Sequence, residues 1–344
     1  MRRAVMLAAA ACICAGARAQ DPPRVRLLCE GELPAQAQGV KGLVGGISGL
    51  AYDGQRGTWI AVSDVKRGAC FVELRLTLGP ALTMEVPARP TLQVEVVRVF
   101  GHPALERGSP TDAEAIAIAP DGMEWFVGFE QPPSVLRLEP ANGEAKTIPI
   151  ERTFIELVRP NRAFESVALR PTDTGPELWI ATENALTPEP VATRTEGQRC
   201  RVLVFDPPSL ALRRESVYIT EPLARGETAA QAFVALTDLA AMPDGRVLAL
   251  EKNWSTKHGP GAQIFCMSGQ ERELEQDSRG ARALVKIPIG DLRELGASPA
   301  GTIEAMAIGP VMAKGSAESM LVLIEDNNFA PGRGSQVIVL ALTP

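Results

Sequence analysis

Five segments of this chain repeat one plan, and the repeat constrains the fold more than any other feature. Each segment begins with a short run that alternates small and large apolar residues, and it ends with a second run that is almost entirely apolar. The five first runs begin at Ile47, Ala113, Phe164, Thr237 and Ile303. In two segments the runs are joined by Pro-Asp-Gly, at 120–122 and 243–245, where proline fixes φ and glycine accepts a positive φ. Each segment therefore predicts a β-hairpin.

Two further strand-like runs follow the second hairpin, at 134–138 and 146–150. Four antiparallel strands per repeat unit are typical of a propeller blade. We therefore predict an all-β protein that forms a single β-propeller of four-stranded antiparallel blades. Six blades fit the chain length and are the expectation, and five larger blades fit the visible repeats equally directly. The runs 25–28 and 336–342 are expected to close one blade.

The N-terminus has the features of a secretory signal peptide. Arg2 and Arg3 precede a stretch of apolar or small residues, and Ala17-Arg18-Ala19 has the small-x-small form of a cleavage site. The apolar stretch is too short to span a bilayer, although an uncleaved anchor is the alternative. We expect residues 1–19 to be removed and residues 20–344 to form one domain, periplasmic or secreted.

Charge and cysteine content limit the partners of the mature chain. Removing residues 1–19 takes away three arginines, which leaves 32 basic against 41 acidic residues and a net charge of −9. Nucleic acids and anionic lipid surfaces bind basic patches, so neither is an expected partner; we expect a monomer that binds a small molecule. Four cysteines remain, an even number that suggests disulfides in an oxidising compartment, with free buried thiols as the alternative.

Acidic residues recur at two places in the repeat. One place is the start of the first run, where Ser48 is the exception, and the acids there are Glu114, Glu165, Asp238 and Glu304. The other is the end of the second run, which carries Asp64, Glu130, Glu183, Glu251, and Glu325 with Asp326. In a hairpin the start of one strand and the end of its partner lie at the same edge. The repeat therefore predicts a ring of carboxylates around one mouth of the channel.

The negative charges of such a ring must be neutralised, because like charges brought together repel. Nearby basic residues are Lys66, Arg67, Arg162 and Lys252. Oxygen ligands without His or Cys favour Ca²⁺ or Mg²⁺ over zinc, so we name Asp64, Glu114, Glu165, Glu183, Asp238, Glu304 and Asp326 as candidate metal ligands. The alternative is structural: these acids accept hydrogen bonds from loop amides and fasten neighbouring blades.

The same residues carry a resemblance to a known family. The elements Gly46–Asp53, Val62–Asp64, Asp112–Ala117, Phe164–Leu169 and Ala181–Glu183, with Leu248–Glu251 and the closing Glu325–Phe329, resemble the phytase-like domain family with esterase-like activity of phytase. The resemblance implies an exported, propeller-like protein that hydrolyses phosphate or carboxylate esters, with Ca²⁺ as the implied cofactor. The net charge of −9 argues against a densely anionic substrate unless a cation screens it.

Two functions remain open at this stage. In the first, bound cations polarise an ester, Glu130 or Glu251 acts as general base, and Arg67, Arg162 or Lys252 stabilises the developing negative charge. In the second, the propeller is not catalytic and binds a small ligand or a protein partner at the channel mouth. A serine esterase is disfavoured because no G-x-S-x-G motif is present and Ser48 has no nearby His.

The aromatic residues and histidines are assigned more simply. Trp59, Trp125 and Trp179 occupy matched positions in the second runs and are expected to fill the core between blades. Trp254 breaks that register, so it is a candidate pocket residue. His102 and His258 are expected in loops.

Overall fold

The computed structural model describes residues 21–36, 44–66, 70–81, 89–105, 110–274, 277 and 279–344. The predicted signal peptide lies outside these residues. In the described part nearly all regular structure is β-strand, apart from one short helix, α1 (Arg152–Ile155), and one 3-10 turn, η1 (Pro103–Leu105). No helix there is long and apolar enough to cross a membrane.

Three of the sheets contain four antiparallel strands. The first comprises β2 (Ile47–Asp53), β3 (Thr58–Ser63), β4 (Cys70–Ala81) and β5 (Pro90–Phe100). The second comprises β6 (Thr111–Ile118), β7 (Trp125–Gln131), β8 (Pro133–Glu139) and β9 (Glu144–Thr147). The third comprises β18 (Thr302–Val311), β19 (Ser319–Asp326), β20 (Ser335–Thr343) and β1 (Arg24–Leu33). The pairing of β1 with β20 confirms that the two ends of the chain share one sheet.

The fourth sheet has eight strands and consists of two four-stranded runs. One run comprises β10 (Ser166–Arg170), β11 (Glu177–Ala185), β12 (Arg199–Asp206) and β13 (Ala211–Ile219). The other comprises β14 (Ala232–Ala241), β15 (Val247–Ser255), β16 (Gly259–Arg272) and β17 (Arg282–Asp291). A short parallel pairing joins the two runs, with Ser216 opposite Arg282 and Val217 opposite Ala283.

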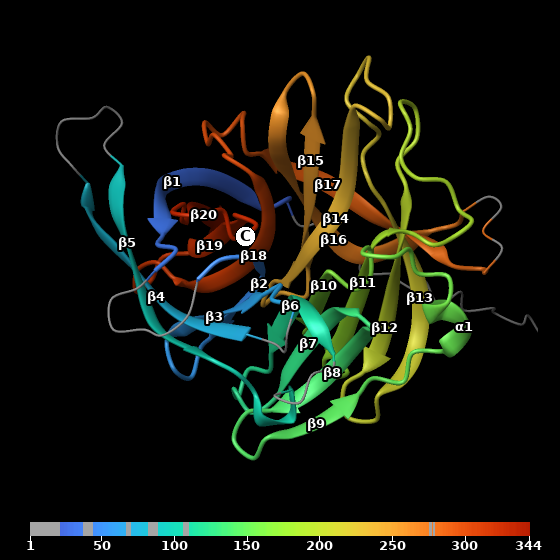
Figure 1. Ribbon diagram of the computed structural model, residues 1–344, viewed down its shortest axis with the longest axis horizontal. Coiled ribbons are helices and arrows are strands. Elements are labelled where there is room, and N and C mark those ends of the chain that lie inside the picture. The colour runs from blue at the N-terminus through green and yellow to red at the C-terminus, as the bar shows by residue number, and fades with distance from the viewer. Residues whose placement is uncertain are drawn as a thin grey trace, which may run out of the picture.

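The first strands of these runs form a closed ring. Strand β2 packs against β6, β6 against β10, β10 against β14 and β14 against β18, which returns to β2 (Figure 1). A cavity of about 160 Å³ lies among them and is lined by apolar residues that include Leu50, Ile116, Val167, Leu239 and Met306. The all-β, propeller-like arrangement of four-stranded sheets is therefore confirmed, whereas the predicted number of six blades is not.

The core lies between neighbouring sheets. Trp59, Trp125 and Trp179 are 2%, 1% and 0% exposed, and each packs against apolar side chains of a neighbouring four-stranded run, as the matched positions predict. Trp179, for example, shares a cluster with Leu239 and Phe265 of the next strand run. Burial of such large aromatic surfaces stabilises the contacts between sheets by a few kcal/mol per side chain.

The four described cysteines are free thiols, which contradicts the expectation of disulfides. Cys29, Cys70, Cys200 and Cys266 lie on β1, β4, β12 and β16, and Cys70 alone is only partly buried. Burial raises the pKa of Cys29, Cys70 and Cys266 to about 11. These side chains pack as small apolar residues: Cys29 and Cys70 contact one core cluster, and Cys200 and Cys266 belong to two others.

Candidate functional site

A β-bulge lies near the start of the first strand in four of the five strand runs. A bulge adds one residue to a strand and re-aims its side chain relative to simple alternation. The extra residues are Ser48 in β2, Glu114 in β6, Thr237 in β14 and Glu304 in β18. Glu165 has the matching place directly before β10, where Ser166 pairs with Ala181.

Asp238 does not belong to this set, contrary to the sequence-based expectation. Its carboxylate accepts hydrogen bonds from the backbone N–H groups of Leu239 and Met306, each at 2.7 Å. Asp238 therefore fastens β14 to β18, which is the structural role considered as the alternative. Thr237 takes the ring position, and its hydroxyl donates to Glu165 at 3.3 Å.

In the second strand of each run, the residue that reaches the mouth is not always the acid that the sequence repeat suggests. The residue that precedes each bulge pairs with Ser63, Phe129, Glu251 or Glu325 on the second strand. The residue that follows each of these four therefore reaches the mouth. With Glu183 of β11, these are Asp64, Glu130, Glu183, Lys252 and Asp326. A lysine thus stands where the repeat suggests an acid.

Glu251 is buried away from this mouth. Its carboxylate accepts hydrogen bonds from the Tyr218 hydroxyl at 2.6 Å and the Glu221 N–H at 2.9 Å, and it pairs with Lys286. Glu251 is therefore not placed to act as general base at the mouth. Glu325 is occupied in the same way by Arg333 and the N–H of Gln336.

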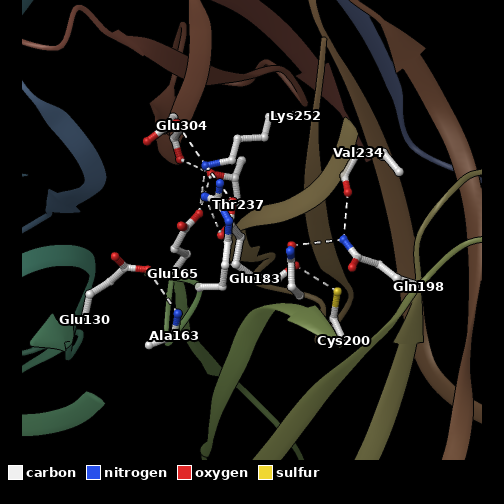
Figure 2. A network of polar contacts seen from close by, with 12 residues as sticks. Glu130, Ala163, Glu165, Glu183, Gln198, Cys200, Val234, Thr237, Lys252 and Glu304 are labelled. Atoms are coloured by element: carbon white, nitrogen blue, oxygen red, sulfur yellow. Dashed lines mark hydrogen bonds and ion pairs between the residues drawn. The ribbon is translucent and has the colours of Figure 1, made fainter. Parts of the chain in front are cut away.

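Lys252 is surrounded by three carboxylates, two from the run that begins with β10 and one from β18. Its Nζ lies 3.0 Å from Glu165 Oε2, 3.0 Å from Glu183 Oε1 and 2.9 Å from Glu304 Oε1 (Figure 2). Burial lowers the pKa of Lys252, but the three carboxylates outweigh burial and raise this pKa well above its usual value. Arg162 adds a second cation through contacts of 3.0–3.1 Å with both oxygens of Glu183.

A second group of carboxylates lacks such a cation at its centre. Asp112, Glu114 and Glu130 each offer an oxygen within 4.8 Å of the others, and all three residues are buried. Lys66 pairs with Asp112 at 2.7 Å, and Glu130 accepts the N–H of Ala163 at 3.0 Å. Among the described residues, no donor reaches the carboxylate of Glu114. Glu130 also belongs to a neighbouring triad with Glu165 and Glu183, the acids that Lys252 and Arg162 already neutralise.

Asp64 and Asp326 extend the acidic side of the mouth. The Asp64 Oδ1 atom is buried without a hydrogen-bond partner in the described structure. Gly46 lies directly against it: φ there is +56°, and an added Cβ would lie 1.8 Å from this oxygen. Asp326 accepts the N–H of Asn328 at 2.7 Å. We name the ten residues Asp64, Asp112, Glu114, Glu130, Arg162, Glu165, Glu183, Lys252, Glu304 and Asp326 the mouth cluster.

Burial and mutual repulsion favour the protonated carboxyl groups in this cluster. Burial, supported by Glu304 and Glu130, raises the pKa of Glu114 well above its usual value. Burial also raises the pKa of Asp64 to about 6 and the pKa values of Glu130 and Asp326 to about 7. The acidic half of the mouth is therefore an environment that a proton or a metal cation stabilises.

The remaining predicted residue, Arg67, lies outside the described residues. Asp112 is the functional candidate that sequence reasoning missed. It adopts a positive φ of 63° and is completely buried, a conformation that non-glycine residues rarely adopt. Its position two residues before Glu114 was a usable signal, because residues two apart in a strand point to the same side.

Comparison with known proteins decides the family. The family model "Phytase-like: Esterase-like activity of phytase" matches residues 42–329. This chain belongs to the Phytase-like family. All ten residues of the mouth cluster, from Asp64 to Asp326, lie inside the matched region. No curated protein matches the chain.

Solved structures that resemble this Phytase-like chain do so weakly. The PQQ-bound aldose sugar dehydrogenase of Streptomyces coelicolor is 14% identical, with 93% of this chain and 98% of that chain covered and a TM-score of 0.42. The calcium-binding protein regucalcin of Agrobacterium tumefaciens is 13% identical, with coverages of 92% and 94% and a TM-score of 0.38. Similarity at this level does not transfer an activity.

Proposed function

We propose that this protein is an exported hydrolase of phosphate or carboxylate esters. It works at the mouth cluster with a divalent cation, for which Ca²⁺ is the first candidate. The observation that carries the proposal is Glu114: the residue is 6% exposed, no donor among the described residues reaches its carboxylate, and it lies with Asp112 and Glu130. An unpaired buried carboxylate is costly unless it is protonated or binds a cation.

The donor set fits Ca²⁺ on chemical grounds. Asp112, Glu114 and Glu130 offer only carboxylate oxygens, which hard cations prefer. Ligands on opposite sides of a Ca²⁺ ion at about 2.4 Å are about 4.8 Å apart, so the mutual spacing of up to 4.8 Å suits one ion. When bound, the cation would polarise a phosphoryl or carbonyl oxygen of the ester and so make the attached phosphorus or carbon easier for water to attack.

Two side chains at the mouth are suited to the chemistry. Asp64 is partly exposed, and its raised pKa of about 6 lets the ionised form accept a proton from water near neutral pH. Arg162 is 45% exposed, and among the described residues its side chain pairs with Glu183, so its guanidinium group has N–H donors left for a developing negative charge. Lys252 is 5% exposed and already contacts three carboxylates, which favours a positioning role instead.

The second candidate is a propeller that binds a cation or small ligand without catalysis. It is favoured by the backbone hydrogen bonds that Glu130 and Asp326 accept, because acids that hold loop amides also stabilise the fold by themselves. We propose a small-molecule ligand and a monomer in either case. Counting the eight-stranded sheet as two blades, we also propose five blades in place of six.

The test is to purify the protein, measure bound metal, and assay 4-nitrophenyl phosphate and 4-nitrophenyl butyrate with EDTA or with Ca²⁺. Hydrolysis that requires Ca²⁺ and is lost in Glu114→Gln supports the proposal. Glu144→Gln, an exposed acid on β9, is the matched control and should retain activity. Ca²⁺ binding without turnover of either ester favours the second candidate, and absence of both binding and turnover contradicts the first.

A further inference from the structure

A second pocket lies beside the mouth cluster and has a different chemical character. Its volume is about 260 Å³, close to the lower range for small-molecule sites. It is lined by the start of β14, the end of β15, the loop that follows β13 and the strands β16 and β17. Trp254 lines it and lies on β15 only two residues beyond Lys252.

The pocket contains an exposed aromatic platform. Phe233 and Trp254 are opposite each other in the pairing of β14 with β15, and their rings are nearly parallel, at 17°. They are 41% and 36% exposed, whereas the other three tryptophans are buried. Two large aromatic side chains kept together in water at a pocket are a typical binding surface, because their faces provide apolar contact at little conformational cost.

The opposite wall is polar and already held in place. Arg293 donates to the carbonyl groups of His258 and Gly259, at 3.2 Å and 2.9 Å, and also to that of Pro260. Gln263 donates to Asp291 at 3.1 Å, and the other Asp291 oxygen accepts the N–H of Arg293. A wall fixed by its own hydrogen bonds loses little conformational entropy when a ligand binds.

Other polar groups of the pocket have hydrogen-bonding capacity left. In the described structure the side-chain amide of Asn253 and the ring nitrogens of His258 make no hydrogen bond, and Glu221 uses one carboxylate oxygen on Lys286. These groups include both donors and acceptors. The pocket carries charges of both signs: Glu221 pairs with Lys286, and Asp291 lines the pocket together with Arg293.

A flat apolar platform facing mixed donors and acceptors suits a ring that has apolar faces and hydroxyl groups at its edge. We propose that this pocket binds a neutral sugar ring, stacked on Phe233 and Trp254 with its hydroxyl groups on Asn253, His258 and Glu221. The binding itself is independent of the proposed hydrolysis. Assignment of the pocket as the sugar side of an ester substrate rests on the proposed function, and it follows from the position of Trp254 next to Lys252.

The test uses Trp254 as its own reporter, because it is the exposed tryptophan and acrylamide quenches exposed indoles first. Glucose, xylose and methyl glucoside, titrated in the millimolar range, should lower acrylamide quenching about twofold at saturation. Phe233→Ala should weaken the sugar affinity obtained from this titration about tenfold. Met123→Ala, which removes an exposed apolar side chain elsewhere, should leave that affinity unchanged. Trp254→Phe, followed by calorimetry, should retain most of the sugar affinity.

Two outcomes would overturn the proposal. Protection by benzyl alcohol but by none of the sugars would show an apolar ring site without hydroxyl recognition, and no protection by any probe would show that the pocket binds neither. Sugar binding in a protein that hydrolyses no ester would leave this inference standing and remove only the proposed function.

Discussion

The ammonium group of Lys252 lies 3.0 Å from the carboxylate of Glu165, a residue 87 positions earlier in the chain, and both side chains are almost completely buried. The pair joins the two strand runs of the eight-stranded sheet at the channel mouth. With Glu183 and Glu304 also in contact, Lys252 occupies the centre of a set of oxygens that resembles the surroundings of a bound cation. One half of the mouth therefore has a buried cation at its centre, whereas in the other half the described cation, Lys66, contacts Asp112 at the edge of the acidic group.

Lys252→Met should expose this difference. Without the ammonium group, the buried Glu165 and the largely buried Glu304 lose the cation that both contact, so we expect a loss of about 3–5 kcal/mol in unfolding free energy in EDTA. Calorimetry should show one more Ca²⁺ ion bound than in the unmodified protein, with recovery of stability. Lys257→Met, at an exposed position, is the control. Unchanged stability and stoichiometry would show that Lys252 does not hold the three acids.

Glu114→Gln should have the opposite effect in metal-free protein. The substitution removes a buried negative charge that has no described donor, so we expect a gain of about 1–3 kcal/mol at pH 8 in EDTA. It should also abolish the stabilisation by Ca²⁺. Urea unfolding with and without Ca²⁺ measures both effects, and a variant that still gains stability from Ca²⁺ would move the cation site elsewhere.

The mouth cluster should make metal-free protein less stable as pH rises. The folded-state pKa values of Asp64, Glu130 and Asp326, about 6, 7 and 7, lie above their usual values of 3.8, 4.5 and 3.8. The folded state therefore binds more protons, and stability is lost between about pH 4 and pH 7. We expect the Tm in EDTA to fall by roughly 5 °C from pH 5 to pH 8 and Ca²⁺ to flatten the profile. A Tm in EDTA that rises over this range would contradict these shifts.

Glu177 should govern stability at low pH. Burial opposes its ionisation, but hydrogen bonds from Arg214, Trp179 and Arg170 outweigh burial and lower its pKa from 4.5 to about 2. Its contribution is complete above pH 4.5 and is lost as pH falls toward 2. Glu177→Gln should cost about 2–3 kcal/mol at pH 7 and almost nothing at pH 2. An equal cost at both values would indicate a packing effect instead of an ionic one.

The sequence predicted much of the site because the chemistry repeats with the strands. Glu114, Glu165, Glu183 and Glu304 follow from the repeat, and so does their convergence on one mouth. Glu251 and Asp238 were assigned to that mouth wrongly. A shift of one residue in a strand turns a side chain to the other face, and nothing in the local sequence marks which residue a bulge adds. Thr237 and Lys252 therefore occupy the two positions at the mouth to which Asp238 and Glu251 had been assigned.

The sequence by itself determined the all-β class, the four-stranded sheets around a channel and the buried tryptophans, because apolar alternation and turn residues are local properties. Only the tertiary structure decided which carboxylates are neutralised. Charge compensation depends on side chains brought together from distant strands, such as Lys252 with Glu165 or Lys66 with Asp112. It also placed Phe233 against Trp254 at a pocket, since cross-strand pairing and exposure are set by the register of β14 and β15.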